Sequence, residues 1–137
     1  SEFCIRARYE PELLTQISTW GKTEAFTRWL LEKGMPPSRP QHDLFGITPM
    51  HLMAAANQVD RARVFLEYGA DPYPRDNEYG STPLAWAARC GQLEMVSFLI
   101  DQGVTVSHPD DEPWATPIAW ARKRGHSEIV SLLSDQE

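Results

Sequence analysis

The sequence has little cysteine, no long apolar run and no excess of basic residues. Two cysteines in 137 residues are too few for a disulfide framework and are typical of a reducing compartment. The formal net charge of −6 argues against a nucleic-acid-binding protein, whose surface is usually basic. No apolar stretch is long enough to cross a bilayer, and no signal-peptide pattern is present. We therefore expect an intracellular protein, cytoplasmic or nuclear, with neither nucleic acid nor a membrane among its partners.

Catalytic and metal-binding constellations are also lacking. His42 and His108 are not paired with carboxylates or cysteines at the spacing of metal ligands. Cys90 has no base nearby in the sequence, so we interpret it as an unreactive thiol. The acidic run 110–112 lacks the loop of an EF-hand and is interpreted as solvated. No glycine-rich phosphate loop is present, and we expect no enzyme activity, no catalytic residue, no cofactor and no metal.

What the sequence does contain is a helical hairpin with clear start and stop signals. Thr82 is a good N-cap, and Pro83 then occupies the first helical position, where its missing N–H does no harm. Gly91 ends this helix where a left-handed residue is easiest to place. The apolar residues of the next helix, over 92–101, recur at the offsets of one wide helical face, and Gly103 follows it. The stretch therefore predicts two short helices joined by a tight turn.

The hairpin occurs three times. Thr-Pro pairs begin at Thr48, Thr82 and Thr116, which are 34 residues apart, and Asn57 and Gly125 stand where Gly91 ends the inner helix. Such a period is typical of repeat proteins that stack one hairpin on the next. The helices expected are Pro49–Ala56 with Val59–Tyr68, Pro83–Cys90 with Gln92–Asp101, and Pro117–Arg124 with Ser127–Leu133.

The motif Thr48-Pro49-Met50-His51, with Gly69-Ala70-Asp71 after it, resembles the ankyrin-repeat pattern T-P-L-H-x-A. The resemblance implies an all-α fold, a solenoid of stacked helix–turn–helix repeats with β-turn fingers between them. It also implies that the His51 imidazole bonds to Thr48 and to backbone. We expect a single domain over 1–137, divided into a capping repeat with the first finger (1–41), repeat 2 (42–75), repeat 3 (76–110) and repeat 4 (111–137).

The two ends of the array are less regular. Pro11–Trp20 and Lys22–Lys33 keep the hairpin spacing without Thr-Pro, so we interpret them as a degenerate capping repeat. A helical extension unrelated to the repeats is the alternative. Repeat 4 has no closing glycine, and it is either a C-terminal cap made by polar residues such as Ser131 and Ser134, or a truncated repeat. We favour a natural chain that continues.

The ankyrin resemblance also implies a binding surface. In that family the finger turns and the ends of the inner helices line a groove that grips partner proteins. The corresponding partner-binding candidates here are Leu44, Phe45, Ile47, Glu78, Tyr79, Ser81, Trp86, Arg89, Glu112, Trp114, Trp120, Lys123 and Arg124.

Large apolar residues stand at matching places in this set. Leu52, Trp86 and Trp120 are one repeat apart and form either a ladder on the inner face or part of the core. Trp114 replaces the turn glycine seen at Gly80, a position that favours positive φ, so we expect the last turn to differ in shape and its indole to be exposed. The basic run 122–124 either complements an acidic partner or interacts with the negative end of its own helix.

These features predict a non-catalytic protein-binding module that presents fingers and inner helices to a protein or peptide. We expect a monomer, with self-association through the last repeat as one alternative. A regulatory or substrate-recruiting segment of a larger enzyme is the other alternative.

Overall fold

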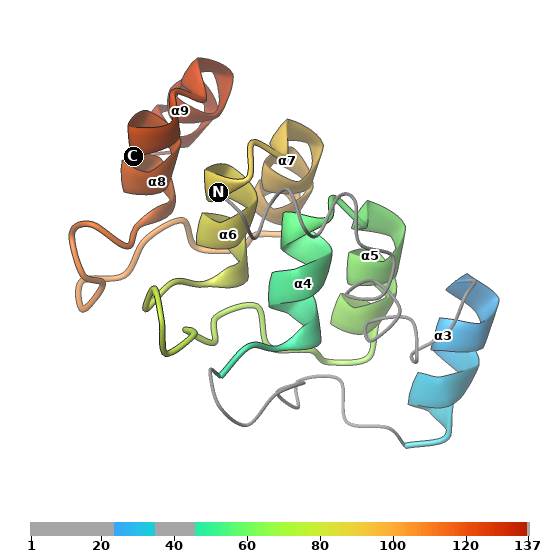
Figure 1. Cartoon of the computed structure of the whole chain (residues 1–137). Coiled ribbons are helices and arrows are strands. Elements are labelled where there is room, and N and C mark those ends of the chain that lie inside the picture. The colour runs from blue at the N-terminus through green and yellow to red at the C-terminus, as the bar shows by residue number, and fades with distance from the viewer. Residues whose placement is uncertain (1–23, 35–45, 137) are drawn as a thin grey trace.

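The computed structural model describes residues 24–34 and 46–136. Its elements over these residues are all α-helices, joined by turns and loops (Figure 1). The seven helices of these ranges are short and come in hairpins, as the Thr-Pro spacing predicts. They are α3 (Glu24–Glu32), α4 (Pro49–Ala55), α5 (Val59–Glu67), α6 (Pro83–Arg89), α7 (Leu93–Asp101), α8 (Pro117–Arg124) and α9 (Ser127–Ser134).

The hairpins stack side by side in two layers. The inner helices α4, α6 and α8 pack in one row, and α3, α5, α7 and α9 pack in a second row behind them (Figure 1). Each inner helix also packs against the outer helix that follows it. Among the described helices, the main contacts therefore run between neighbours, which is the arrangement of a solenoid.

Each inner helix begins at a threonine that caps it. The Oγ1 atoms of Thr48, Thr82 and Thr116 accept hydrogen bonds from the backbone N–H three residues on, at 3.5, 3.4 and 3.2 Å. The proline that follows each threonine occupies the first turn. These observed starts are the predicted ones.

Each inner helix is followed by a left-handed residue. Asn57, Gly91 and Gly125 have φ of 58°, 73° and 76°, so asparagine replaces glycine at a site that it tolerates well. All the predicted helix boundaries that fall on described residues hold to within two residues.

The core lies between the two layers and is widest in the middle of the stack. Every residue of α4 and of α6 is buried, and α6 packs against α4, α7 and α8. From the second layer, Phe65 and Met95 are completely buried. In α8 only Pro117, Trp120 and Ala121 are buried. The most complete packing therefore surrounds α6, which holds several of the candidate residues.

The N-terminal pair is described in part. α3 lies within the predicted second helix, and it packs on α5 as α5 packs on α7, with Thr27 and Leu31 buried. The predicted first helix, Pro11–Trp20, lies outside the described residues. The division of the chain into four repeats remains a prediction.

Candidate partner-binding surface

The finger before α6 is held by one buried carboxylate. Asp76 is only 2 % exposed, and it accepts hydrogen bonds from the backbone N–H of Tyr79 at 2.7 Å and of Ser81 at 3.0 Å. It also accepts the indole N–H of Trp86 at 3.0 Å. An aspartate that bonds to backbone two or three residues on closes a turn. Asp76 therefore fixes where Tyr79 stands, and we did not identify it from the sequence, although an aspartate four residues before the turn Gly80 is a usable signal.

Ser81 joins neighbouring repeats. Its hydroxyl donates to the Ala115 carbonyl at 3.0 Å and accepts from the Trp120 indole N–H at 2.9 Å. Its own carbonyl oxygen accepts from Nε2 of His51 at 2.9 Å. Ser81 is buried, so its contribution is to set the distance between one finger and the helices on both sides of it.

His51 makes the bonds that the resemblance implies. Its Nδ1 lies 3.1 Å from the backbone N and 3.0 Å from Oγ1 of Thr48. Because the backbone N–H can only donate, Nδ1 is the acceptor and Nε2 carries the proton that goes to Ser81. Burial lowers the pKa of His51 below its ordinary value, and the Ser81 carbonyl and Asp76 oppose this in part. The histidine is therefore a neutral structural bridge.

Five side chains from two fingers and two inner helices gather in what we call the Arg89 cluster: Tyr79, Arg89, Trp114, Trp120 and Lys123. The Arg89 guanidinium carbon lies 4.1 Å from the centre of the Tyr79 ring and 4.9 Å from that of Trp120. Its Nη2 donates to the Tyr79 hydroxyl at 3.0 Å. Both distances are within the range of cation–π attraction.

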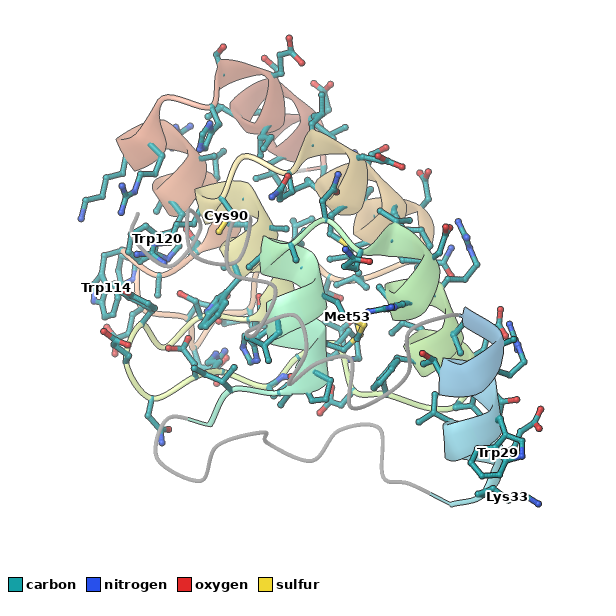
Figure 2. The ribbon with its side chains drawn as sticks, turned by 45° about the vertical axis from the view of Figure 1, so that its right-hand side comes forward. Trp29, Lys33, Met53, Cys90, Trp114 and Trp120 are labelled. Atoms are coloured by element: carbon teal, nitrogen blue, oxygen red, sulfur yellow. The ribbon has the colours of Figure 1, made fainter. Side chains whose placement is uncertain are left out.

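The outer part of the Arg89 cluster faces solvent. The rings of Trp114 and Trp120 meet edge to face with centroids 6.5 Å apart, and Figure 2 shows the two labelled side chains next to each other. Lys123 Nζ lies 5.2 Å from the centre of Trp120. Trp114 is 54 % exposed. The exposed Trp114 indole therefore meets the edge of the buried Trp120 indole, whose ring is contacted by Arg89 and Lys123. Tryptophan, tyrosine and arginine are the residues that most often anchor a partner.

The two expectations about Trp114 are confirmed. Gly46 and Gly80 have φ of 64° and 62°. Trp114, at the matching position, does not have a positive φ, because Asn57 is the only non-glycine residue with one in the described ranges. The last turn is closed instead by a hydrogen bond from Ala115 N to Glu112 O at 2.9 Å. The different turn directs the indole outward.

The predicted ladder exists only indirectly. Tyr79 lies between the two tryptophans, with ring centroids 6.2 Å from Trp86 and 5.6 Å from Trp120. Leu52, Trp86 and Trp120 are all buried. Leu52, Trp86 and Trp120 are therefore part of the core, which was the alternative to a ladder on the inner face. Tyr79, which contacts both tryptophans, is only partly buried.

The remaining candidate residues divide by exposure. Glu78, Glu112, Lys123 and Arg124 are exposed. Ile47, Ser81 and Trp86 are buried, so they shape the surface from beneath. Leu44 and Phe45 lie outside the described residues.

The acidic run after α7 is not simply solvated, and here the sequence interpretation was wrong. Arg75 Nη1 and Nη2 donate to the two carboxylate oxygens of Asp110 at 3.1 and 3.0 Å, and its Nε donates to Asp111 at 3.0 Å. The Arg75 guanidinium lowers the pKa of Asp110, and the two carboxylates raise that of Arg75. These ion pairs tie one finger to the next.

The interpretation of Cys90 as an unreactive thiol was also wrong, because its sulfur is in a disulfide. Within the described residues, no group of three or more histidine, cysteine, aspartate or glutamate side chains is placed to hold a metal ion.

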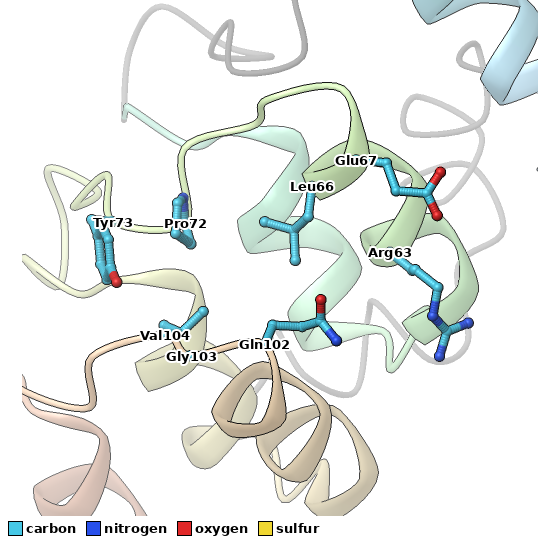
Figure 3. Close-up of a pocket in the computed structure, with 8 residues that line it drawn as sticks. All are labelled: Arg63, Leu66, Glu67, Pro72, Tyr73, Gln102, Gly103 and Val104. Atoms are coloured by element: carbon cyan, nitrogen blue, oxygen red, sulfur yellow. The ribbon is translucent and has the colours of Figure 1, made fainter.

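A hollow with a volume of about 300 Å³ lies between α5 and the end of α7, lined by residues outside the Arg89 cluster (Figure 3). Arg63, Leu66 and Tyr73 are among its lining residues, and we did not predict it. Its polar groups have partners: Arg63 Nη1 lies 3.1 Å from Asp60, and the Tyr73 hydroxyl accepts a bond from Thr105 N at 3.0 Å. The hollow therefore presents few free groups to a ligand.

Comparison with known protein families identifies the family to which the chain belongs. The family described as ankyrin repeats (three copies) matches residues 14–110, more than two thirds of the chain. The chain belongs to the ankyrin-repeat family. The hairpin of α8 and α9 lies beyond the matched residues and continues the same packing. A comparison with curated proteins gave no match.

Ankyrin repeats are in general protein-binding modules, and that general description applies here. Among the helices in the described ranges, none has both the length and the apolar character needed to cross a membrane.

Proposed function

We propose that this chain is a non-catalytic module that binds a partner protein or peptide through the Arg89 cluster and the exposed finger residues around it. The observation that carries the proposal is the cluster itself, in which an exposed indole, a tyrosine and two cations come together from separate repeats. Tryptophan, tyrosine and arginine supply most of the binding energy at protein interfaces.

The scaffold favours such a role because the surface is formed before any partner arrives. Tyr79 is fixed by Asp76, and Trp120 is fixed by Ser81. A preformed surface avoids much of the entropy cost of ordering loops on binding. The net charge of −6 supports a protein partner over a nucleic acid.

The exposed tryptophans allow a matched test of this surface. Trp114→Ala and Tyr79→Ala should each weaken binding by about 1–2 kcal/mol, because each removes an aromatic anchor. The control is Trp29→Ala, since Trp29 is 49 % exposed and has Lys33 5.8 Å from its ring, but lies on α3 at the far end of the stack (Figure 2).

A partner captured with the full chain would be titrated against each variant by calorimetry. The proposal predicts a loss with the two cluster variants and an unchanged affinity with the α3 variant. Equal affinity for all three variants would remove this surface from consideration.

The proposal includes a monomeric protein in the cytoplasm or nucleus. The low cysteine content supports this location. The disulfide of Cys90 argues against it, because disulfides are rare in the reducing cytosol and nucleus. Light scattering over a range of concentrations should give a constant monomer mass. Imaging of the tagged protein in its own cells tests the location.

A further inference from the structure

The end of α8 carries three cations that have no ionic partner. Arg122, Lys123 and Arg124 are consecutive and exposed, and among the described residues no ion pair includes any of them. The whole chain has a formal net charge of −6, so this run is a local exception. Positive charge is therefore concentrated at one end of one inner helix.

The helix end does not itself account for three cations. The aligned peptide dipoles place about half a negative charge at a helix C-terminus, so a fraction of one cation is enough to offset it. The equivalent helix α4 ends with no basic residue in its last turn, and α6 has only Arg89, which is buried. Inner helices of this stack therefore form without such a run, and most of its charge is available to a partner.

An exposed apolar surface lies next to these cations. Lys123 Nζ is 5.2 Å from the centre of the Trp120 ring, and the Trp114 ring meets the same indole with centroids 6.5 Å apart (Figure 2). Because Lys123 and Trp114 contact one indole, a single partner segment can reach both. Trp114 is 54 % exposed and Lys123 is exposed, so a partner contacts them without displacing a buried group.

The charge on the finger side of Trp114 has the opposite sign. Glu112 stands two residues before Trp114, and Glu78 stands next to Tyr79 on the neighbouring finger. Both glutamates are exposed, and neither is in an ion pair among the described residues. The 8 residues of α8 extend over about 12 Å between the Trp114 finger and the basic run, which exceeds the screening length of about 8 Å at physiological ionic strength. The surface is therefore negative at the fingers, aromatic in the middle and positive at the end of α8.

We propose that the surface formed by Trp114 and Lys123 binds an extended segment of the partner protein that has acidic residues on one side of an apolar residue. The apolar residue covers Trp114, and an aspartate or glutamate two or three positions away pairs with Lys123. Side chains at that spacing in an extended segment are roughly 7–10 Å apart, which suits two groups on one indole. This inference rests on the proposed function and names the chemistry of the partner.

The surrounding charges set the direction of the segment. Arg122 and Arg124 flank Lys123 in the sequence and add to the positive potential that attracts the acids. Glu112 repels acids on the other side of the apolar residue, because like charges brought together at an interface are unfavourable. We therefore expect acids on one side of the apolar residue and neutral or basic residues on the other.

Selection of peptides on the full chain tests the proposal. Random peptides displayed on phage are selected, and each selected peptide is synthesised with its acids intact, changed to glutamine, or changed to lysine. The selected sequences should be enriched in acids on one side of an apolar residue. Raising the salt from about 0.1 M to about 1 M shortens the screening length from about 10 Å to about 3 Å. It should therefore weaken the acidic peptides and leave the glutamine peptides unchanged.

Charge reversal tests the residues. The double variant Lys123→Glu with Arg124→Glu should bind the acidic peptides at least about fivefold more weakly, because attraction is replaced by repulsion. The lysine peptides should bind this variant more tightly than they bind the wild type, which a misfolded surface would not allow. If circular dichroism shows that the double variant is unfolded, Lys123→Gln replaces it, and the preference for acidic over glutamine peptides should fall about twofold or more.

Lys33→Glu is the matched control. Lys33 is also exposed, and its Nζ lies 5.8 Å from the ring centre of an exposed tryptophan, Trp29, on α3 at the far end of the stack. This variant should bind the acidic, glutamine and lysine peptides as the wild type does. Fluorescence anisotropy with labelled peptides measures every affinity.

The outcomes separate this inference from the proposed function. Selected peptides that lose affinity for Trp114→Ala but lack acids, or that bind the charge-reversed variant as they bind the wild type, would overturn the inference and leave the binding surface in place. Acids on both sides of the apolar residue would also overturn it, as would tighter binding of a single-stranded RNA of mixed sequence than of the acidic peptides. If the wild-type chain selects no peptide, the proposed function fails and the inference fails with it.

Discussion

Single buried polar residues decide the geometry of this surface. Asp76 and Ser81 have short side chains, yet between them they fix the positions of Tyr79, Trp86 and Trp120. Arg89 differs from both because its Nε and Nη1 have no hydrogen-bond partner among the described residues, although Nη2 donates to Tyr79. Buried polar groups are normally hydrogen-bonded, so Asp76 and Ser81 follow the general rule and Arg89 departs from it.

The left-handed glycines give a matched pair of stability tests. Gly91 and Gly103 have φ of 73° and 83°, so alanine is strained at both. A Cβ at Gly91 would also lie 2.7 Å from Cε1 of His126, whereas nothing lies within 4 Å at Gly103. We expect Gly91→Ala to lower the free energy of unfolding by about 2–3 kcal/mol and Gly103→Ala by about 1 kcal/mol.

Urea denaturation monitored by circular dichroism measures both values, provided that the slope of the transition is the same for each variant. The larger loss at Gly91 includes displacement of His126, whose Nε2 donates to the Arg89 carbonyl at 3.1 Å. Equal losses in the two variants would contradict the predicted contact with His126.

At the scale of the element, each hairpin is defined by how its inner helix begins. Three Thr-Pro starts have the same cap, but only the first has histidine as the fourth residue, where the others have Ala85 and Ala119. His51 therefore gives the first hairpin an extra bond to the finger of the next one. Elements with similar local sequences can thus differ in how firmly they hold their neighbours.

The pH dependence of stability tests this bridge. Burial lowers the pKa of His51 in the folded chain below its ordinary value of 6.5. Below pH 6.5 the unfolded chain therefore binds a proton on this imidazole that the folded chain does not bind. The stability from the neutral imidazole is complete above pH 6.5 and is lost as the pH falls toward the folded pKa. The free energy of unfolding should fall with a slope of up to about 1.4 kcal/mol per pH unit.

In His51→Ala that slope should be absent, and stability at pH 7 should be lower by about 1–3 kcal/mol because Ser81 O and Thr48 N lose their partner. His126→Ala is the control that should keep the slope. Denaturant titrations at several pH values between 5 and 8 measure it. A slope that survives in His51→Ala would assign the pH dependence to another group.

At the scale of the whole molecule, the sequence predicts the stack well because its signals are local. Threonine caps, prolines at N1 and left-handed stops each act within a few residues, and they recur with one period. The candidate surface was predicted less well. Contacts such as Arg75 with Asp110 join residues 35 apart in different fingers, and no local pattern reports them.

Burial was the second quantity that the sequence did not reveal. Ile47, Ser81 and Trp86 occupy positions that face partners in the family pattern, but here they are buried. The exposure of Trp114 was predictable, because a bulky residue at a turn-glycine position must change the turn. Arg89 was identified by its position, and the lack of a hydrogen-bond partner for its Nε and Nη1 among the described residues is visible only in the structure.

The most direct test of the account is a nuclear Overhauser measurement on the free chain. The central claim is that stacking in register brings a finger side chain, Tyr79, against Trp120 of the next repeat, with ring centroids 5.6 Å apart. We predict cross-peaks between the Tyr79 ring protons and the Trp120 indole, and the variant Tyr79→Phe should preserve them. If the indole protons of Trp120 show no cross-peak to the Tyr79 ring, the Arg89 cluster does not exist and the account is contradicted.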